Sequence, residues 1–150
     1  MKIIKTIALF LLIAFIAIQF IPTVYNQSDI IPKTDFVMVK KPPKNVSKIL
    51  KQSCYDCHSN NTEYPWYSKI QPAAWFLEDH IKKGKSELNF NKWNDLSNRR
   101  KNSKLKSIIN QIDKDEMPLD SYTLIHRDAI LSKSEKDLVT NYMKQIKDNL

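Results

Sequence analysis

The spacing of apolar and polar positions divides the chain into three parts. Residues 1–21 are dominated by an uninterrupted apolar run from Ile7 to Ile18. Residues 22–44 contain four of the seven prolines and show no sustained periodicity, which predicts an extended tether. Residues 45–150 repeat apolar positions at spacings of three and four, as amphipathic helices do. The pattern therefore predicts an apolar N-terminal segment, a tether and one mostly helical domain.

Four helices are predicted in this domain. Their ranges are 45–53, 72–83, 97–114 and a fourth that begins after Ser132. The fourth is the clearest, because Ser132 and Glu135 have the spacing of a capping box ahead of a regular apolar stripe. Gly84 is expected to end the second helix, since glycine commonly follows the last helical residue.

The N-terminal apolar run predicts a single membrane anchor. The segment from Ile3 to Ile21, which contains this run, has 19 residues, about 28 Å of helix at about 1.5 Å per residue, against a hydrocarbon core of about 30 Å. The residues that leave the run include almost none of the small ones that a signal-peptide cleavage site needs, so the anchor is expected to stay. Lys2 and Lys5 precede it, and residues 22–32 contain no Lys or Arg. The positive-inside rule then predicts a single pass through the cytoplasmic membrane, with the C-terminal domain on the periplasmic, extracytoplasmic side. A buried core helix is the alternative.

The amino-acid composition excludes some fold classes and some kinds of partner. With 1 Gly in 150 residues, folds that need many tight turns or a Gly-rich phosphate loop are disfavoured, and a helical fold is favoured. The formal net charge is +8, but the basic residues are spread along the chain and form no recognisable nucleic-acid module. We therefore expect no nucleic-acid partner. The basic excess suits an acidic protein partner or anionic lipid headgroups beside the anchor.

Both cysteines of the chain lie in one pentapeptide, Cys54-Tyr55-Asp56-Cys57-His58. This is the attachment pattern of c-type haem. Two thiols three positions apart, at the end of a helix, can form thioethers with the two vinyl groups on one edge of a haem, and the adjacent imidazole can bind the iron. The pentapeptide therefore predicts haem c as the cofactor, Cys54 and Cys57 as its attachment points, and His58 as the proximal iron ligand.

Three other interpretations of the pentapeptide stay open. A disulfide between the two cysteines would close a very short loop and leave His58 unexplained. A thioredoxin-like dithiol needs a βαβ setting, for which the sequence gives no sign. A zinc site would need two further ligands, for which His80 and His126 are available without a recognisable spacing.

Three further blocks of sequence accompany the pentapeptide. They are Tyr64–Ser68, Leu88–Trp93 and Met117–Tyr122. With these blocks, residues 35–149 resemble the haem-binding domain family of small, membrane-anchored bacterial c-type cytochromes, although Asn91 stands where a Ser would be expected. The resemblance implies covalent haem binding in the cell envelope. The expected fold class is mostly α: a cytochrome c-like helical domain around the haem, preceded by one transmembrane helix.

A second axial ligand would keep the iron geometry fixed during electron transfer, and Met117 and His80 are the main candidates. Met117 precedes a proline in a loop after a predicted helix, as in the distal Met loop of cytochromes c. His80 shares a predicted helix face with apolar neighbours and would point inward. His126 is a third candidate. An open iron position would instead indicate a ligand sensor or a peroxidase-like enzyme.

The surroundings of the haem are less defined by the sequence. The aromatic residues Tyr64, Trp66, Tyr67 and Trp75 are expected to wall it. Arg99, Arg100 or Arg127 could bind its propionates. We expect one-electron transfer with redox protein partners, and therefore an electron carrier more than a catalyst. The alternatives are the sensor or peroxidase-like enzyme and a zinc-stabilised interaction module.

Overall fold

The computed structural model describes residues 1–28 and 30–150, and these residues form helices and no strand. In chain order the elements are α1 (Lys2–Ile18), α2 (Phe36–Lys40), α3 (Lys44–Ser53), α4 (Tyr55–His58), η1 (Trp66–Lys69), α5 (Ala73–Glu87), η2 (Phe90–Asp95), α6 (Asn98–Asp113), α7 (Asp120–Thr123), η3 (Arg127–Ala129) and α8 (Lys133–Asp148). The expected helical character is thus confirmed.

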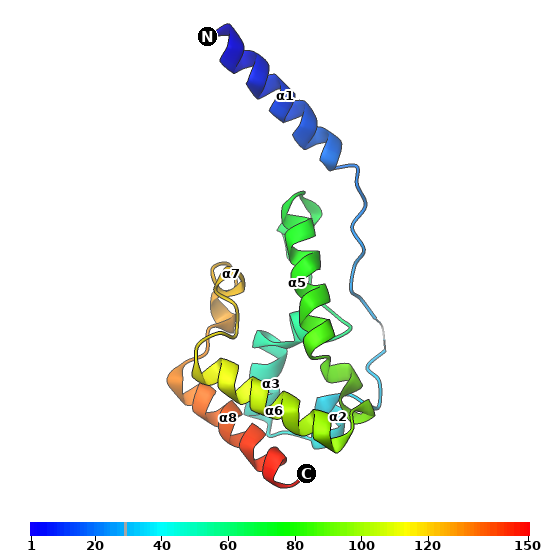
Figure 1. Cartoon of the computed structure of the whole chain (residues 1–150), viewed down its shortest axis with the longest axis vertical. Coiled ribbons are helices and arrows are strands. Elements are labelled where there is room, and N and C mark those ends of the chain that lie inside the picture. The colour runs from blue at the N-terminus through cyan, green and yellow to red at the C-terminus, as the bar shows by residue number, and fades with distance from the viewer. Residues whose placement is uncertain (29) are drawn as a thin grey trace.

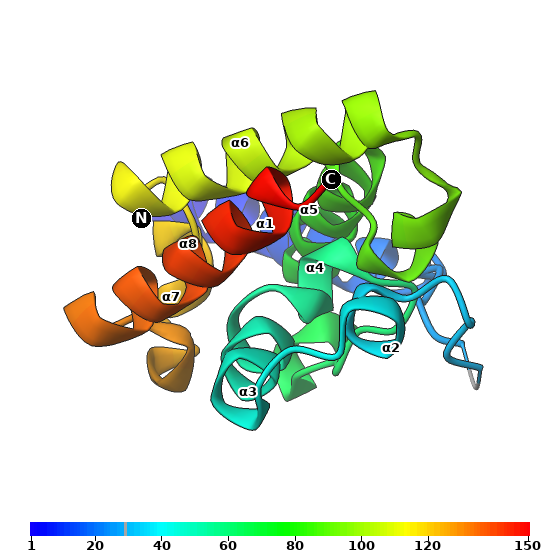
Figure 2. The same ribbon diagram turned by 90° about the horizontal axis from the view of Figure 1, so that it is seen from below.

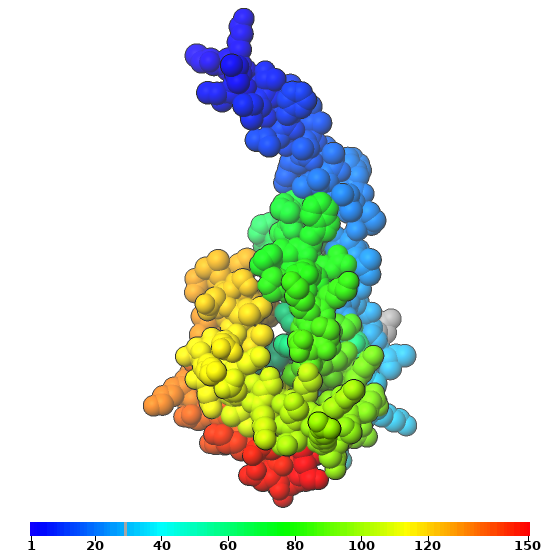
Figure 3. All heavy atoms as spheres, in the orientation of Figure 1, coloured from blue at the N-terminus to red at the C-terminus, as the bar shows by residue number. Residues whose placement is uncertain are grey.

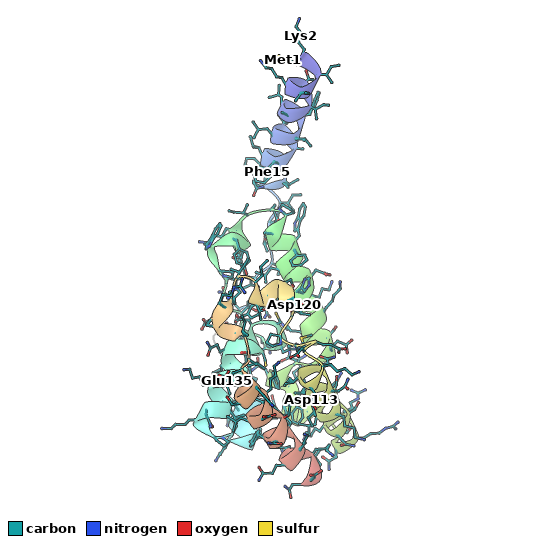
Figure 4. All side chains as sticks on the ribbon, turned by 90° about the vertical axis from the view of Figure 1, so that its left-hand side faces the viewer. Met1, Lys2, Phe15, Asp113, Asp120 and Glu135 are labelled. Carbon is teal, nitrogen blue, oxygen red and sulfur yellow. The ribbon has the colours of Figure 1, made fainter. Side chains whose placement is uncertain are left out.

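Helix α1 stands apart from the other helices, with Met1 at its far end and Phe15 near the domain (Figures 1 and 4). It has 17 residues, or about 25 Å at about 1.5 Å per residue. Within the described part of the chain, no helix is both long and apolar enough to cross a membrane. The predicted transmembrane anchor over residues 1–21 is therefore wrong, and so is the predicted single pass through the cytoplasmic membrane, on which the expected extracytoplasmic placement depended.

The predicted span reaches Ile21, whereas the helix ends at Ile18, just before Gln19 and Pro22. The Gln19 side-chain amide donates to the Phe15 carbonyl at 2.9 Å and to the Gln71 carbonyl at 3.1 Å. In return, the Gln71 backbone N–H donates to Gln19 Oε1 at 2.9 Å. Pro22 also biases its predecessor away from the helical conformation. Residues 19–21 therefore leave the helix at the point where the chain meets the start of α5.

The stretch expected to be an extended tether is partly folded onto the domain. Asn26 donates to the Ser59 carbonyl at 3.0 Å and accepts a backbone bond from Thr62 at 2.9 Å. Asp35 caps α2 by accepting from the backbone N–H of Val37 at 2.9 Å. Phe36, the first residue of α2, is fully buried. Periodicity could not reveal the contacts of Asn26, because they are made to residues more than thirty positions along the chain.

The main core lies between α3, η2, α6 and α8. Helices α6 and α8 lie side by side and run in opposite directions (Figures 1 and 2). The buried cluster consists of Phe36, Val46, Ile49, Leu50, Phe90, Trp93, Leu105, Ile112, Leu131, Val139, Met143 and Ile146. The four predicted helices correspond to α3, α5, α6 and α8, and the predicted capping box of Ser132 and Glu135 is present.

Helix α5 differs from its predicted range at its C-terminal end. It continues through Gly84 and ends at Glu87, so the expectation that Gly84 terminates it is wrong. No described glycine has a positive φ, which is the conformation that a helix-ending glycine usually takes. The extra turn extends α5 past the pentapeptide Cys54–His58, called the CxxCH segment below, and brings Leu88 beside His58.

Candidate functional site

The CxxCH segment forms a tight helical turn directly after α3. Cys54 ends α3, where its backbone N–H donates to the Leu50 carbonyl at 3.0 Å, and its φ of −131° breaks the helix. The short helix α4 then begins, and the His58 N–H donates to the Cys54 carbonyl at 3.0 Å. Both cysteines are free thiols. The turn holds the two thiols and the imidazole on a single rigid piece of backbone.

A cavity of about 390 Å³ adjoins this turn. Its lining includes Cys54, Cys57 and His58 from the turn, together with His80 and Met117. Helix α5 forms one wall and helix α6 another, while the loop after α6 brings Met117. The cavity is of the size and mainly apolar character expected of a small-molecule site. The structure thus brings together five of the six residues that the sequence singled out for attachment and ligation, His126 being the exception.

A second cavity of about 380 Å³ shares Cys57, His80 and Leu119 with the first. It is lined mainly by aromatic and aliphatic side chains, including Trp66 and Tyr67. Figure 3 shows the molecule hollowed between α5, in green, and the yellow-to-orange segment that runs from the end of α6 through α7. The two cavities adjoin at Cys57, His80 and Leu119, and the lining of each is mainly apolar.

His58 is held in one tautomer by the backbone of Leu88. Its Nδ1 lies 3.0 Å from the Leu88 carbonyl oxygen, which can only accept, so Nδ1 carries the proton. Burial lowers the pKa of His58, and hydrogen bonding to the backbone opposes this only in part. The ring is therefore neutral at physiological pH, and Nε2 keeps its lone pair. This is the state in which histidine binds a metal, and the Leu88 carbonyl is the kind of partner that orients such a ligand.

Both thiols are kept protonated by their surroundings. Burial, and then the proximity of Cys57, raise the pKa of Cys54 to about 12. Burial, and then the charge of Asp56, raise the pKa of Cys57 to about 11. A catalytic dithiol needs at least one cysteine with a lowered pKa, because the thiolate is the nucleophile. This environment therefore gives no support to the thioredoxin-like interpretation.

Gly84 allows α5 to approach the CxxCH turn closely. A Cβ atom at this position would lie 2.7 Å from the Cys57 carbonyl oxygen and 3.2 Å from Cys57 Cβ. Only a residue without a side chain fits such an approach. The close contact places the end of α5, and with it the Leu88 carbonyl, within reach of His58.

A network of hydrogen bonds centred on Asp35 and Asn91 supports the turn from behind. Tyr55 donates to Asp35 Oδ2 at 3.1 Å, and the Asn91 side chain donates to the same oxygen at 2.8 Å. Asn91 Oδ1 accepts from the backbone N–H of Asn60 at 2.6 Å. The side chain of Asn89 donates to Asn60 Oδ1 at 2.8 Å. The Leu88–Trp93 block, which was singled out only by resemblance, is therefore the scaffold that holds the turn.

Asp56, between the two cysteines, links the turn to two other segments. Its Oδ1 accepts from the Glu63 backbone N–H at 3.0 Å, and its Oδ2 accepts from the Tyr122 hydroxyl at 2.7 Å. Tyr122 lies on α7, just after the loop that carries Met117. Sequence reasoning missed the roles of Asp35 and Asp56. The position of Asp56 inside the CxxCH segment could have pointed to its role, whereas nothing in the sequence near Asp35 points to its role.

The three candidates for a distal ligand occupy different places. Met117 and His80 both line the cavity beside Cys57, and both are half-buried. His80 Nδ1 is 2.8 Å from the Phe76 carbonyl oxygen, which leaves Nε2 free. His126 lines a separate groove, called the outer groove here, whose lining also includes Met38 and Tyr64. The Nε2 atom of His126 is 2.9 Å from the Tyr67 hydroxyl. The zinc interpretation, which needs His80 and His126 beside the same two thiols, therefore has no geometric support.

The expected aromatic wall is only partly formed. Trp66 and Tyr67 line the second cavity. Tyr64 lies on the outer groove, where its ring meets Tyr25 edge to face at 4.7 Å. Trp75 is exposed and lines neither of the two adjoining cavities.

Residues 13–145 match a protein family described as a haem-binding domain. The chain belongs to the haem-binding domain family. No curated protein and no solved structure matches the chain. The family match makes haem the group against which the cavity should be tested, and the donor set fits it. Two thiols, an imidazole with a fixed tautomer and an apolar space adjoin one another in this haem-binding protein.

Proposed function

We propose that this haem-binding domain holds a single haem c and serves in one-electron transfer. The observation that carries the proposal is the cavity that collects Cys54, Cys57 and His58 on one rigid turn, with the His58 tautomer fixed by Leu88. A bound haem supplies a reversible one-electron iron couple. The side chains around the haem would attach it and bind its iron.

In this proposal Cys54 and Cys57 attach the cofactor. Each thiol adds its S–H across one vinyl group, so that a carbon–sulfur bond forms and no net oxidation or reduction occurs. The high pKa of both thiols keeps the S–H bonds intact until attachment. His58 Nε2 would bind the iron, and the Leu88 carbonyl, by accepting from Nδ1, would increase the electron donation of the imidazole.

The opposite face would be closed by Met117, with His80 as the alternative. A thioether raises the reduction potential relative to a second imidazole, so the two choices predict different potentials. Either one would exclude external ligands and favour electron transfer over ligand sensing or peroxidase chemistry. The net charge of +8 suits encounter with an acidic redox partner, which should weaken as salt is added.

The attachment test compares the wild-type protein with Cys57→Ala in a host that is competent for cytochrome c maturation. The wild-type protein should keep its colour after acid acetone extraction and gain the mass of one haem. Cys57→Ala should lose most stable attachment, and Ser59→Ala, which leaves both thiols in place, should retain it. A colourless wild-type protein with the mass of the bare polypeptide would refute the proposal.

The ligand test compares Met117→Ala and His80→Ala, each with a matched control outside the cavity. Met38→Ala and His126→Ala serve as controls, because these residues line the outer groove. If Met117 binds the iron, its removal alone should abolish the thioether-to-iron charge-transfer band of the oxidised protein. Binding of carbon monoxide by the reduced wild-type protein at micromolar levels would contradict a closed distal face and hence electron transfer as the main role.

A further inference from the structure

Helix α6 gives the cavity a strip of polar side chains, in a lining that also includes Ser53 of α3 and Lys83 and Glu87 of α5. Helix α6 contributes Lys104, Ser107 and Gln111, which are spaced by three and four residues and so lie along one face. Ile108 and Ile112 of the same helix also line the cavity. This arrangement sets a strip of hydrogen-bond donors beside an apolar surface. The thiols are on a different wall, formed by the end of α3 and by α4.

Haem has the same division in its own chemistry. Its vinyl groups lie on one side of the macrocycle, and its two propionate carboxylates lie on the other. If Cys54 and Cys57 hold the vinyl side, the propionates must face another part of the wall. A carboxylate that enters a partly apolar site needs a cation or hydrogen-bond donors, because an unpaired charge there is costly.

Two lysines line this cavity, and their environments differ. Lys83 is 73% exposed and is paired with Asp79 one helical turn away, at 2.6 Å. The side chain of Lys104 is only 32% exposed, and its ammonium group is 3.7 Å from the carboxylate of Glu87. Glu87 is itself 82% exposed, so it can turn to solvent without loss of a buried contact. Of the two lysines, Lys104 is therefore the one that is largely buried at the cavity and whose only ion pair, within the described part of the chain, is with an exposed carboxylate.

The other two donors of the strip have no competing partner in the described part of the chain. No hydrogen bond is formed there by the side chain of Ser107 or by that of Gln111. Arg99, Arg100 and Arg127, which the sequence suggested for this role, are absent from the linings of both adjoining cavities. The polar strip thus offers a cation, a hydroxyl and an amide in one place.

We infer that Lys104 binds a haem propionate, with Ser107 and Gln111 as neutral donors beside it. This inference rests on the proposed function, since it assumes that the thiols hold the opposite edge. Lys104 would neutralise a carboxylate close to the iron, and its positive charge would disfavour the oxidised, more positive haem. Lys104 therefore raises the reduction potential.

The test measures the midpoint potential and the resonance Raman spectrum of the haem-loaded protein. Lys104→Gln removes the charge, and Lys104→Arg keeps it. Lys106→Gln is the matched control, because Lys106 is exposed on the same helix and does not line the cavity. We expect Lys104→Gln to lower the midpoint potential clearly more than Lys106→Gln does, and to shift the propionate bending mode. Lys104→Arg should keep both close to wild type.

Equal potential shifts in Lys104→Gln and Lys106→Gln, with an unchanged propionate mode, would overturn this inference alone. Failure of Lys104→Gln to acquire thioether-bound haem during maturation, with normal attachment in Lys104→Arg and Lys106→Gln, would support the need for a cation at this position. A wild-type protein without thioether-bound haem would overturn both this inference and the proposed function. The two failures are therefore distinguishable in one set of samples.

Discussion

Replacement of Gly84 by alanine tests the close approach between α5 and the CxxCH turn. The new Cβ would lie 2.7 Å from the Cys57 carbonyl oxygen, whereas ordinary contacts begin at 3.4 Å. The two backbones must therefore separate by about 0.7 Å, because the obstacle is backbone and not a movable side chain. The same movement would stretch the 3.0 Å bond between His58 and the Leu88 carbonyl at the end of α5.

Two opposing terms set the expected change in stability. In a helix without neighbours, glycine to alanine stabilises by about 1 kcal/mol. Overpacking of a well-packed contact costs about 1–3 kcal/mol. The net change in the free energy of unfolding should thus lie between about zero and a loss of about 2 kcal/mol. The experiment decides whether Gly84→Ala lowers the free energy of unfolding or raises it, as it would in a helix without close neighbours.

Urea unfolding of the haem-loaded protein, followed by circular dichroism, measures this change. Ser86→Ala is the control, because Ser86 is exposed on the same helix and alanine there meets no backbone. Ser86→Ala should be neutral or stabilising by a few tenths of a kcal/mol. If Gly84→Ala is stabilised by about 1 kcal/mol, the proposed close contact does not exist.

Three further substitutions test the core, the support of the turn and the cap of α8. Phe36→Ala should lower the free energy of unfolding by about 3–5 kcal/mol in urea titrations, because Phe36 is fully buried against Phe90 and Trp93. Asn91→Ala should cost about 1–3 kcal/mol in the same assay, because it removes a donor to buried Asp35; no measurable loss would count against the network. Hydrogen bonds from Ser132 lower the pKa of Glu135. The stability that the Glu135 carboxylate contributes should therefore be complete above pH 4.5, the usual pKa of glutamate, and should disappear as the pH falls through the lower pKa of the folded state. Thermal unfolding from pH 6 downward should therefore show a steeper acid loss for the wild-type protein than for Glu135→Gln, and parallel curves would refute this linkage.

The sequence predicted the long helices better than the short ones. Helices α3, α5, α6 and α8 carry apolar stripes over several turns, so local spacing alone defines them. Helix α2 was missed, because its five residues are held by Asp35 and by burial of Phe36 against a distant block. At the N-terminus the count of apolar residues overestimated the helix, which ends where Gln19 forms hydrogen bonds with the distant Gln71.

The candidate site shows the same division between local and distant signals. The pentapeptide predicted both thiols and His58 as site residues, because their chemistry depends on spacing within one turn, and all three line one cavity. The partner of His58 is a backbone carbonyl thirty residues away, and a carbonyl has no sequence signature. Gly84 was visible as a glycine, but its reason is a neighbouring backbone and not the end of a helix.

The folding of residues 26–28 and 30–40 onto the domain bears on how this protein can be shortened. A piece that starts at residue 45 would expose the Phe90 and Trp93 rings that now pack on Phe36, and would leave Tyr55 and Asn91 facing water in place of a carboxylate. The smallest autonomous unit should therefore start at or before Asn26. Covalent haem alone would not replace the missing segment, because that segment supports the turn from the side away from the cavity.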